Sequence, residues 1–125
     1  SVHQGPHRVS PALNDVQLEP GMVLSNEPGL YISGRYGIRI ENLCVVVEND
    51  ELSKDNPYGP FFGFDDLTMV PYCRKLIDTA LLTHGERAAV DAYHARVRAT
   101  LLPLLGKHAD HDLVRAWLEH ETAPL

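Results

Sequence analysis

The chain has 125 residues, enough for a domain with a modest core, and a formal net charge of -6. Its 44% apolar and 22% charged residues are typical of a soluble globular protein, and no apolar run approaches the roughly 18 residues of a membrane helix. The acidic balance argues against a nucleic-acid partner, which needs a basic patch. Cys44 and Cys73 form no CxxC pair, so the sequence predicts a reducing, cytoplasmic location, with Cys44 as a small buried apolar residue.

The start of the chain reads as the middle of a protein. Ser1-Val2-His3 contains no methionine, turn or helix start, so we expect the chain to be a fragment that begins inside a strand. His3 precedes the turn signal Gly5-Pro6, which places it at the exit of that strand. Taken alone, this histidine also fits a solvated loop residue, the commoner role for histidine.

The run Met22–Glu27 has the pattern of a strand and ends at Pro28-Gly29. Because side chains alternate along a strand, Glu27 shares a face with Val23 and Ser25. The proline that follows keeps Glu27 out of helical backbone and favours an extended conformation. Glu27 by itself is equally consistent with an exposed charge at the end of a strand.

A second strand-like run, Gly37–Val47, carries Glu41 in its interior and Arg39 on the same face. A glutamate inside a Val- and Ile-rich strand is unfavourable unless another group pairs with it. An ion pair with Arg39 is one explanation. Shared metal ions are the other, since the Gly-rich connection can fold back as a hairpin that brings Glu27 to Glu41, and hard divalent cations bind carboxylate oxygens.

The rest of the chain predicts a loop over residues 48–63, a strand over Phe64–Pro71 and two helices. Thr83 and Glu86 have the spacing of a capping box, which starts the first helix, and Pro103 predicts its kink or end. The last helix is expected from Asp110 or Asp112, with one apolar face. That face comprises Leu113, Val114, Trp117 and Leu118. The histidines at 94, 108, 111 and 120 are interpreted as surface or interface residues, since they show no i, i+4 pairing into an apolar pocket.

Three motifs together resemble the second half of the pita-bread metallopeptidases, the superfamily of aminopeptidase P, prolidase and methionine aminopeptidase. They are Val2-His3-x-Gly5-Pro6, the run 18–29 (LEPGMVLSNEPG) and the run 37–43 (GIRIENL). The tail, from LTMVP at 67–71 to the closing Trp117-Leu118, is similar to the C-terminal domain of the three-domain aminopeptidase P branch. The resemblance covers essentially the whole chain. It implies an α+β fold: the second half of a pita-bread catalytic domain, with antiparallel strands, over residues 1–63, then a small C-terminal domain of one strand and two helices over residues 64–125.

The resemblance also implies a site with two divalent metal ions, manganese first, with zinc or cobalt as alternatives. Glu27 and Glu41 match two metal ligands, with Glu41 bridging both ions and Glu27 also acting as general base. His3 matches a catalytic histidine that contacts the substrate near the scissile bond. Arg39 and Tyr31 match substrate-binding residues beside the site for the substrate's proline.

The implied function is removal of the first residue from peptides that have proline second, by a cytoplasmic protein that forms a homodimer. Two aspartate ligands and a histidine ligand of the family belong to segments before position 1, so we expect the fragment alone to be inactive. Gln4 departs from the family, which mostly has an acidic residue there. Two alternatives remain: a prolidase-type dipeptidase, and a metal-free relative that serves peptide binding or dimerisation.

Overall fold

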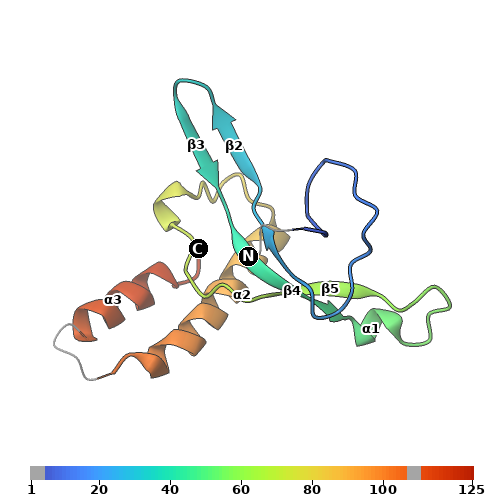
Figure 1. The fold of residues 1–125 in the computed structure, drawn as a ribbon. Helices are drawn as coiled ribbons and strands as arrows, with labels where there is room; N and C mark the ends of the chain where they lie inside the picture. Colours follow the sequence, from blue (N-terminus) through green and yellow to red (C-terminus); the bar gives the residue numbers. More distant parts are fainter. Residues whose placement is uncertain (1–4, 107–110) are drawn as a thin grey trace. The chain divides into compact units, whose positions relative to one another are not determined.

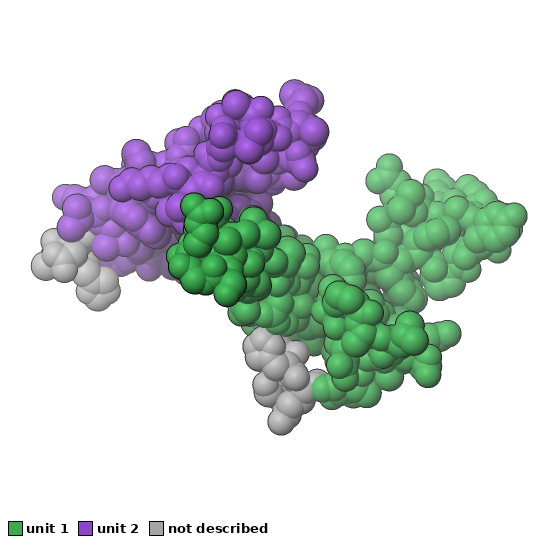
Figure 2. Space-filling view, turned by 90° about the horizontal axis from the view of Figure 1, so that it is seen from above, with its two compact units in different colours: residues 1–68 green, residues 69–125 purple. Residues whose placement is uncertain are grey.

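The computed structural model describes residues 5–106 and 111–125, and the chain forms two compact units, residues 1–68 and 69–125 (Figure 2). Each unit has its own cluster of buried apolar side chains. Within the described ranges, no helix combines the length and apolar character needed to cross a membrane. The elements, drawn in Figure 1, are in chain order β1 (Val23–Asn26), β2 (Gly29–Ile32), β3 (Tyr36–Arg39), β4 (Asn42–Glu48), α1 (Asp50–Ser53), β5 (Phe62–Asp66), η1 (Arg74–Leu76), α2 (His84–Leu101), η2 (Leu102–Leu104) and α3 (His111–Glu121).

The first unit is built on an antiparallel ribbon that keeps one register along its length. Leu24 of β1 lies opposite Cys44 of β4, and β2 pairs with β3 in the continuation of the same register. Between the two ladders, the Ile40 N–H donates to the carbonyl oxygen of Pro28 at 3.1 Å. Figure 1 shows the β2–β3 hairpin extending from β1 and β4. Proline has no N–H to donate, so the ladder is interrupted beside Pro28.

This interruption corrects one prediction from the sequence. The expected single strand Gly37–Val47 is two strands, β3 and β4, separated by Ile40 and Glu41. β4 lies between β1 and β5 in a three-stranded sheet of the described residues, and the predicted burial of Cys44 is confirmed by a side chain only 1% exposed. The predicted α+β fold with antiparallel strands is confirmed.

The strand expected at Phe64–Pro71 begins and ends earlier, as β5 (Phe62–Asp66). β5 pairs with β4, and the Leu67 N–H donates to the Leu43 carbonyl at 2.8 Å, so this strand belongs to the sheet of the first unit. The expected loop before it contains the short helix α1, which Asn49 caps by accepting the Leu52 N–H at 2.9 Å.

The second unit begins its long helix as predicted. Thr83 Oγ1 accepts the Glu86 N–H at 3.2 Å, and Glu86 Oε2 accepts the Thr83 N–H at 2.8 Å, so the capping box is confirmed. These reciprocal bonds satisfy backbone donors that have no partner inside the first turn. α2 ends at Leu101, and Pro103 lies in the tighter turn η2, where the sequence predicted a kink or an end.

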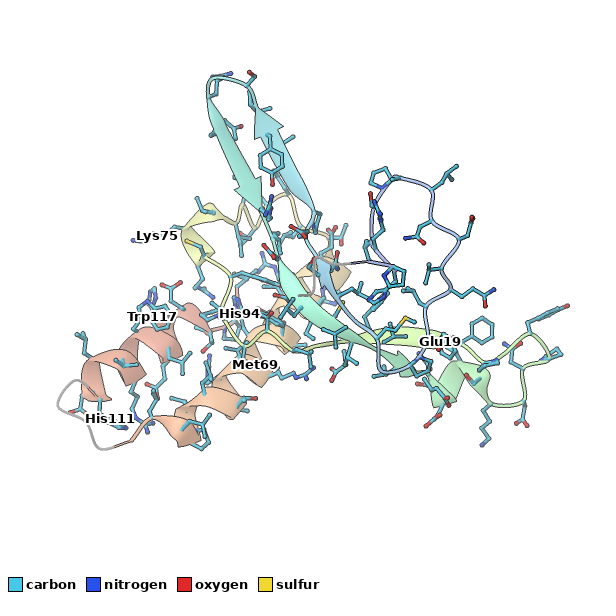
Figure 3. The ribbon with its side chains drawn as sticks, viewed as in Figure 1. Glu19, Met69, Lys75, His94, His111 and Trp117 are labelled. Atoms are coloured by element: carbon cyan, nitrogen blue, oxygen red, sulfur yellow. The ribbon has the colours of Figure 1, made fainter. Side chains whose placement is uncertain are left out.

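The core of the second unit shows that the surface interpretation of His94 was wrong. Tyr93, Val97 and Leu118 are buried together, and the ring of Tyr72 stacks on that of Tyr93 with centroids 4.6 Å apart. His94, labelled in Figure 3, is 0% exposed, and its Nε2 accepts the Tyr72 N–H at 3.0 Å. Helix periodicity did not reveal this, because the partner of His94 is a backbone amide 22 residues away.

The predicted apolar face of α3 is only partly buried. Leu118 is 2% exposed, whereas Trp117, labelled in Figure 3, is 52% exposed, and Leu113 and Val114 are also exposed. His111 is half-buried and His120 is exposed. The prediction for His108 and the proposed cap at Asp110 lie outside the described residues.

Candidate functional site

The two candidate metal ligands are cross-strand neighbours. Ser25 lies opposite Leu43 at the end of the β1–β4 ladder, and Gly29 lies opposite Arg39 at the start of the β2–β3 ladder. The shared register therefore places Glu27 opposite Glu41 at the interruption of the ribbon. Side chains of directly opposed residues lie on the same face of an antiparallel pair. The predicted convergence of the two carboxylates thus follows from the register.

A single arginine joins the two carboxylates. Arg39 Nη1 lies 3.2 Å from Glu27 Oε2 and 3.6 Å from Glu41 Oε2. Arg39 is on the same face because it precedes Glu41 by two residues in extended backbone. All three side chains are partly exposed, at 49% for Arg39, 29% for Glu27 and 39% for Glu41, so solvent weakens these ion pairs. The arrangement marks a point between the carboxylates where positive charge is favoured.

Tyr31 extends this constellation along the same face. Its hydroxyl oxygen accepts a hydrogen bond from Arg39 Nε at 2.8 Å, and the Arg39 guanidinium carbon lies 5.9 Å from its ring centroid. The hydrogen bond to Tyr31 first, and the charges of Glu27 and Glu41 less strongly, raise the pKa of Arg39 above its ordinary value. Arg39 is therefore held on two sides, by the phenol and by the carboxylates.

Glycine makes this position of the Tyr31 ring possible. A Cβ atom on Gly37 would lie 2.5 Å from Tyr31 Cδ1, and one on Gly29 would lie 2.6 Å from the hydroxyl oxygen. The ring therefore lies across the backbone of both strands. The turn that joins them contains Gly34 at φ +68°, a left-handed conformation that favours glycine.

Ser25 is a member of the site to which the sequence assigned no role. Its hydroxyl donates to Glu27 Oε1 at 2.7 Å, so one carboxylate oxygen faces Ser25 and the other faces Arg39. The signal was present in the sequence, because alternation places Ser25 on the face of Glu27. A cavity of about 250 Å³ adjoins Glu27. Its lining is Gly5, His7, Arg8, Val9, Leu24, Ser25 and Glu27.

The residues present fit part of a divalent-metal site. Two opposed carboxylates supply the oxygen ligands that hard divalent cations prefer, and a guanidinium already lies between them. Across residues 5–106 and 111–125, no three His, Cys, Asp or Glu side chains are grouped so that they could hold a metal ion. Glu27 and Glu41 therefore account for two ligands. His3 and Gln4 lie outside the described residues.

An antiparallel ribbon that presents two opposed carboxylates, an arginine and an aromatic ring along one face defines the class: a fold and site of the metallopeptidase type. Two family models match the chain. The model for the C-terminal region of peptidase M24 matches residues 60–125, and that of metallopeptidase family M24 matches residues 1–48. The chain belongs to the M24 metallopeptidases, which confirms the predicted resemblance.

Individual relatives narrow this assignment. A probable Xaa-Pro aminopeptidase P of Fusarium vanettenii is 46% identical over 98% of this chain and 20% of its own length. One from Tuber melanosporum is 42% identical over all of this chain and 20% of its own length. The chain thus spans about one fifth of the length of these curated relatives.

A solved structure agrees with the sequence relatives. The X-prolyl aminopeptidase of Caenorhabditis elegans, described as a cytosolic enzyme with a di-nuclear active site, matches with a TM-score of 0.75 and 36% identity. The match covers 86% of this chain and 17% of the nematode chain. The fold expected from the resemblance is confirmed by this likeness.

Proposed function

We propose that this chain is part of a metal-dependent aminopeptidase that removes the first residue from peptides with proline in second position. The observation that carries the proposal is the pair Glu27 and Glu41, opposed across one ribbon and both within 4 Å of Arg39 Nη1. The Xaa-Pro aminopeptidases among the relatives supply the substrate class. We propose residues 1–63 as the C-terminal half of the catalytic domain and residues 64–125 as the C-terminal domain.

Glu27 and Glu41 would hold the metal ions, with Glu41 between the two. Two divalent cations, manganese in our proposal, supply an acidified nucleophilic water and a positive charge for the transition state. Manganese ranks ahead of zinc and cobalt because the two ligands present here are carboxylates, which suit harder cations than thiolates or imidazoles do.

Glu27 is placed to accept a proton. A carboxylate acts as general base when an oxygen lies within hydrogen-bonding reach of the proton and its pKa matches the task. The Ser25 hydroxyl occupies Oε1 and Arg39 lies at Oε2, so the orientation of the carboxyl plane is fixed from both sides. This preorganisation keeps the proton acceptor aligned without reorganisation during the reaction.

Arg39 and Tyr31 would position ligand and substrate. Arg39 orients Glu41 through the 3.6 Å ion pair, and its bond to Tyr31 fixes the guanidinium on the ribbon. The half-exposed ring of Tyr31 presents an apolar face beside the site, which suits the flat ring of a substrate proline. His3 would stabilise the negative charge that develops on the carbonyl oxygen.

The full protein is proposed to be cytoplasmic and homodimeric. The location agrees with two free cysteines in the described residues and with the nematode relative, which is described as cytosolic. The exposed side chains of Leu113, Val114 and Trp117 on α3 supply an apolar surface in the C-terminal unit that a second subunit would cover.

The test is a full-length protein containing this chain, assayed with manganese on a tripeptide Xaa-Pro-Xaa and a dipeptide Xaa-Pro. We expect hydrolysis of the tripeptide at the first bond, loss of activity after metal removal, and recovery when manganese is added back. Glu41→Ala should lose both bound metal and turnover, whereas Glu48→Ala, at the far end of β4, should lose neither.

The alternatives give different results in the same assay. Preference for the dipeptide would identify a prolidase-type enzyme, and peptide binding without turnover or metal would identify a non-catalytic relative. Full activity of Glu41→Ala would refute the ligand assignment. The 125-residue chain by itself should bind manganese weakly and hydrolyse neither peptide.

A further inference from the structure

One face of α2 carries a polar stripe that contacts the last residues of the chain. Arg87, Asp91 and Arg98 follow one another at helical spacing, and all three are half-buried. The segment after α3, residues 122–125, lies against this stripe through hydrogen bonds. Charged side chains are seldom buried without partners, and here the partners are main-chain groups of the tail.

Thr122 anchors the start of the tail. Its side chain belongs to a residue only 2% exposed, and the hydroxyl donates to the Leu118 carbonyl at 2.6 Å. Arg98 Nε donates to that same hydroxyl oxygen at 2.8 Å, and Arg98 Nη2 donates to the Thr122 carbonyl oxygen. The hydroxyl therefore acts as both donor and acceptor, a combination that serine reproduces and valine does not.

The remaining tail residues are bound through their backbone. Arg74 of η1 donates to the main-chain oxygens of Ala123 and Pro124, the latter at 3.0 Å. Arg87 Nη1 donates to the main-chain oxygen of Leu125 at 2.9 Å. Asp91 Oδ1 accepts the Leu125 N–H at 2.8 Å.

These contacts have a common feature. Each main-chain oxygen from residue 122 to residue 125 accepts a hydrogen bond from an arginine, and the N–H of the last residue donates to an aspartate. The Thr122 hydroxyl is the tail side-chain group in these bonds. Hydrogen bonds to charged groups are about twice as strong as neutral ones, so this set binds a backbone tightly.

We propose that Arg74, Arg87, Asp91 and Arg98 form a peptide-binding groove, the tail groove, whose occupant is the chain's own segment 122–125. The groove selects a hydroxyl residue at the first position and accepts varied side chains at the next three. The tail is a bound ligand that joins η1, α2 and α3 of the second unit. This inference is independent of the proposed peptidase function.

The test separates ligand from groove. A chain truncated after Glu121 is titrated with the synthetic peptide acetyl-Thr-Ala-Pro-Leu, and binding is followed by calorimetry. We expect saturable binding, retained within about threefold for the Ser and for the Pro→Ala peptide, and weakened by about tenfold or more for the Val peptide because a charge-assisted hydrogen bond is lost. A folded truncated chain that binds no peptide, or binds the Val peptide equally well, overturns the proposal.

A second measurement decides the matter if the truncated chain does not fold. Hydrogen exchange of the Leu125 amide is measured by NMR in the intact chain. We expect exchange slowed by about tenfold or more relative to an unstructured peptide, because this amide donates to Asp91. Asp91→Ala should remove the protection, and Asp112→Ala, an exposed acid of α3, should not. Exchange at the unstructured rate in the intact chain refutes the groove.

Discussion

The ring of Tyr31 lies directly on the backbone of Gly37, its partner across the β2–β3 ladder. No other residue type fits at Gly37 with the ring in this place, since a Cβ atom would meet Tyr31 Cδ1 at 2.5 Å. The glycine thereby lets the phenol reach Arg39, and Arg39 in turn reaches both glutamates. Site geometry depends here on the absence of a side chain.

Gly37→Ala should displace Tyr31 and break its bond to Arg39. The ring is half-exposed and free to rotate, so we expect the free energy of unfolding to change by less than about 1 kcal/mol while the Arg39 Nε–H signal shifts in NMR spectra. Tyr31→Phe should give the same shift, since it removes the acceptor. Gly63→Ala, in β5 with open space for a Cβ, is the matched control. An unchanged Nε–H signal in Gly37→Ala contradicts this account.

Arg39→Ala and Glu41→Gln should change cation binding in opposite directions. Removing the guanidinium leaves two opposed carboxylates without their shared positive charge, so the weak manganese affinity of this chain should rise about fivefold. Glu41→Gln removes a ligand charge and should lower the affinity. Calorimetric titration at low salt measures both.

Arg35→Ala controls for net charge, because Arg35 lies in the turn at the far end of the hairpin. An equal gain of affinity in Arg35→Ala and Arg39→Ala would show that total charge, not the local site, governs binding.

Thr83→Ala should lower the free energy of unfolding of the second unit by about 1 kcal/mol, while Thr83→Ser retains most of the cap. The Thr83 N–H first, and then its hydroxyl, lower the pKa of Glu86. A lowered pKa in the folded state means that the stabilisation is present above about pH 4.5 and is lost as the pH falls through the folded value. Urea unfolding at pH 7 and pH 3 checks this, and an unchanged Thr83→Ala penalty at pH 3 contradicts it.

His94 should make the second unit less stable in mild acid. Burial first, then Arg74, lowers the pKa of His94; Arg98 adds to this, while Asp91 and Glu121 oppose it. The unfolded chain therefore takes up the proton first, so the contribution of His94 is complete above about pH 6.5 and declines as the pH falls below it. In protonated His94, Nε2 would become a donor and lose the Tyr72 N–H.

The comparison with His94→Gln isolates this effect from the other histidines. Thermal unfolding at pH 8 and pH 5 should show a smaller loss of stability for the variant than for the parent chain. His120→Gln, at an exposed position of α3, serves as the control and should behave as the parent does. A parent chain and a His94→Gln variant that lose stability equally would contradict the assignment.

Sequence reasoning found the parts of the site that depend on local pattern. Alternation placed Glu27 with Ser25 and Glu41 with Arg39, and the spacing of Thr83 and Glu86 identified the capping box. These features depend on neighbours within a few residues, so period and residue type suffice to predict them. Pro28 was read as the end of a strand, but its partner Ile40, and thus the division of the second run into β3 and β4, was not visible in the pattern.

By itself, the sequence determined which residues carry the chemistry, the antiparallel strand pattern and the family to which the chain belongs. Only the tertiary structure decided that one register sets Glu27 opposite Glu41, that Arg39 joins them, and that His94 and the tail are bound inside the second unit. These relationships join residues up to 50 positions apart. Such contacts are fixed by packing and by the need of buried polar groups for partners, which no local period records.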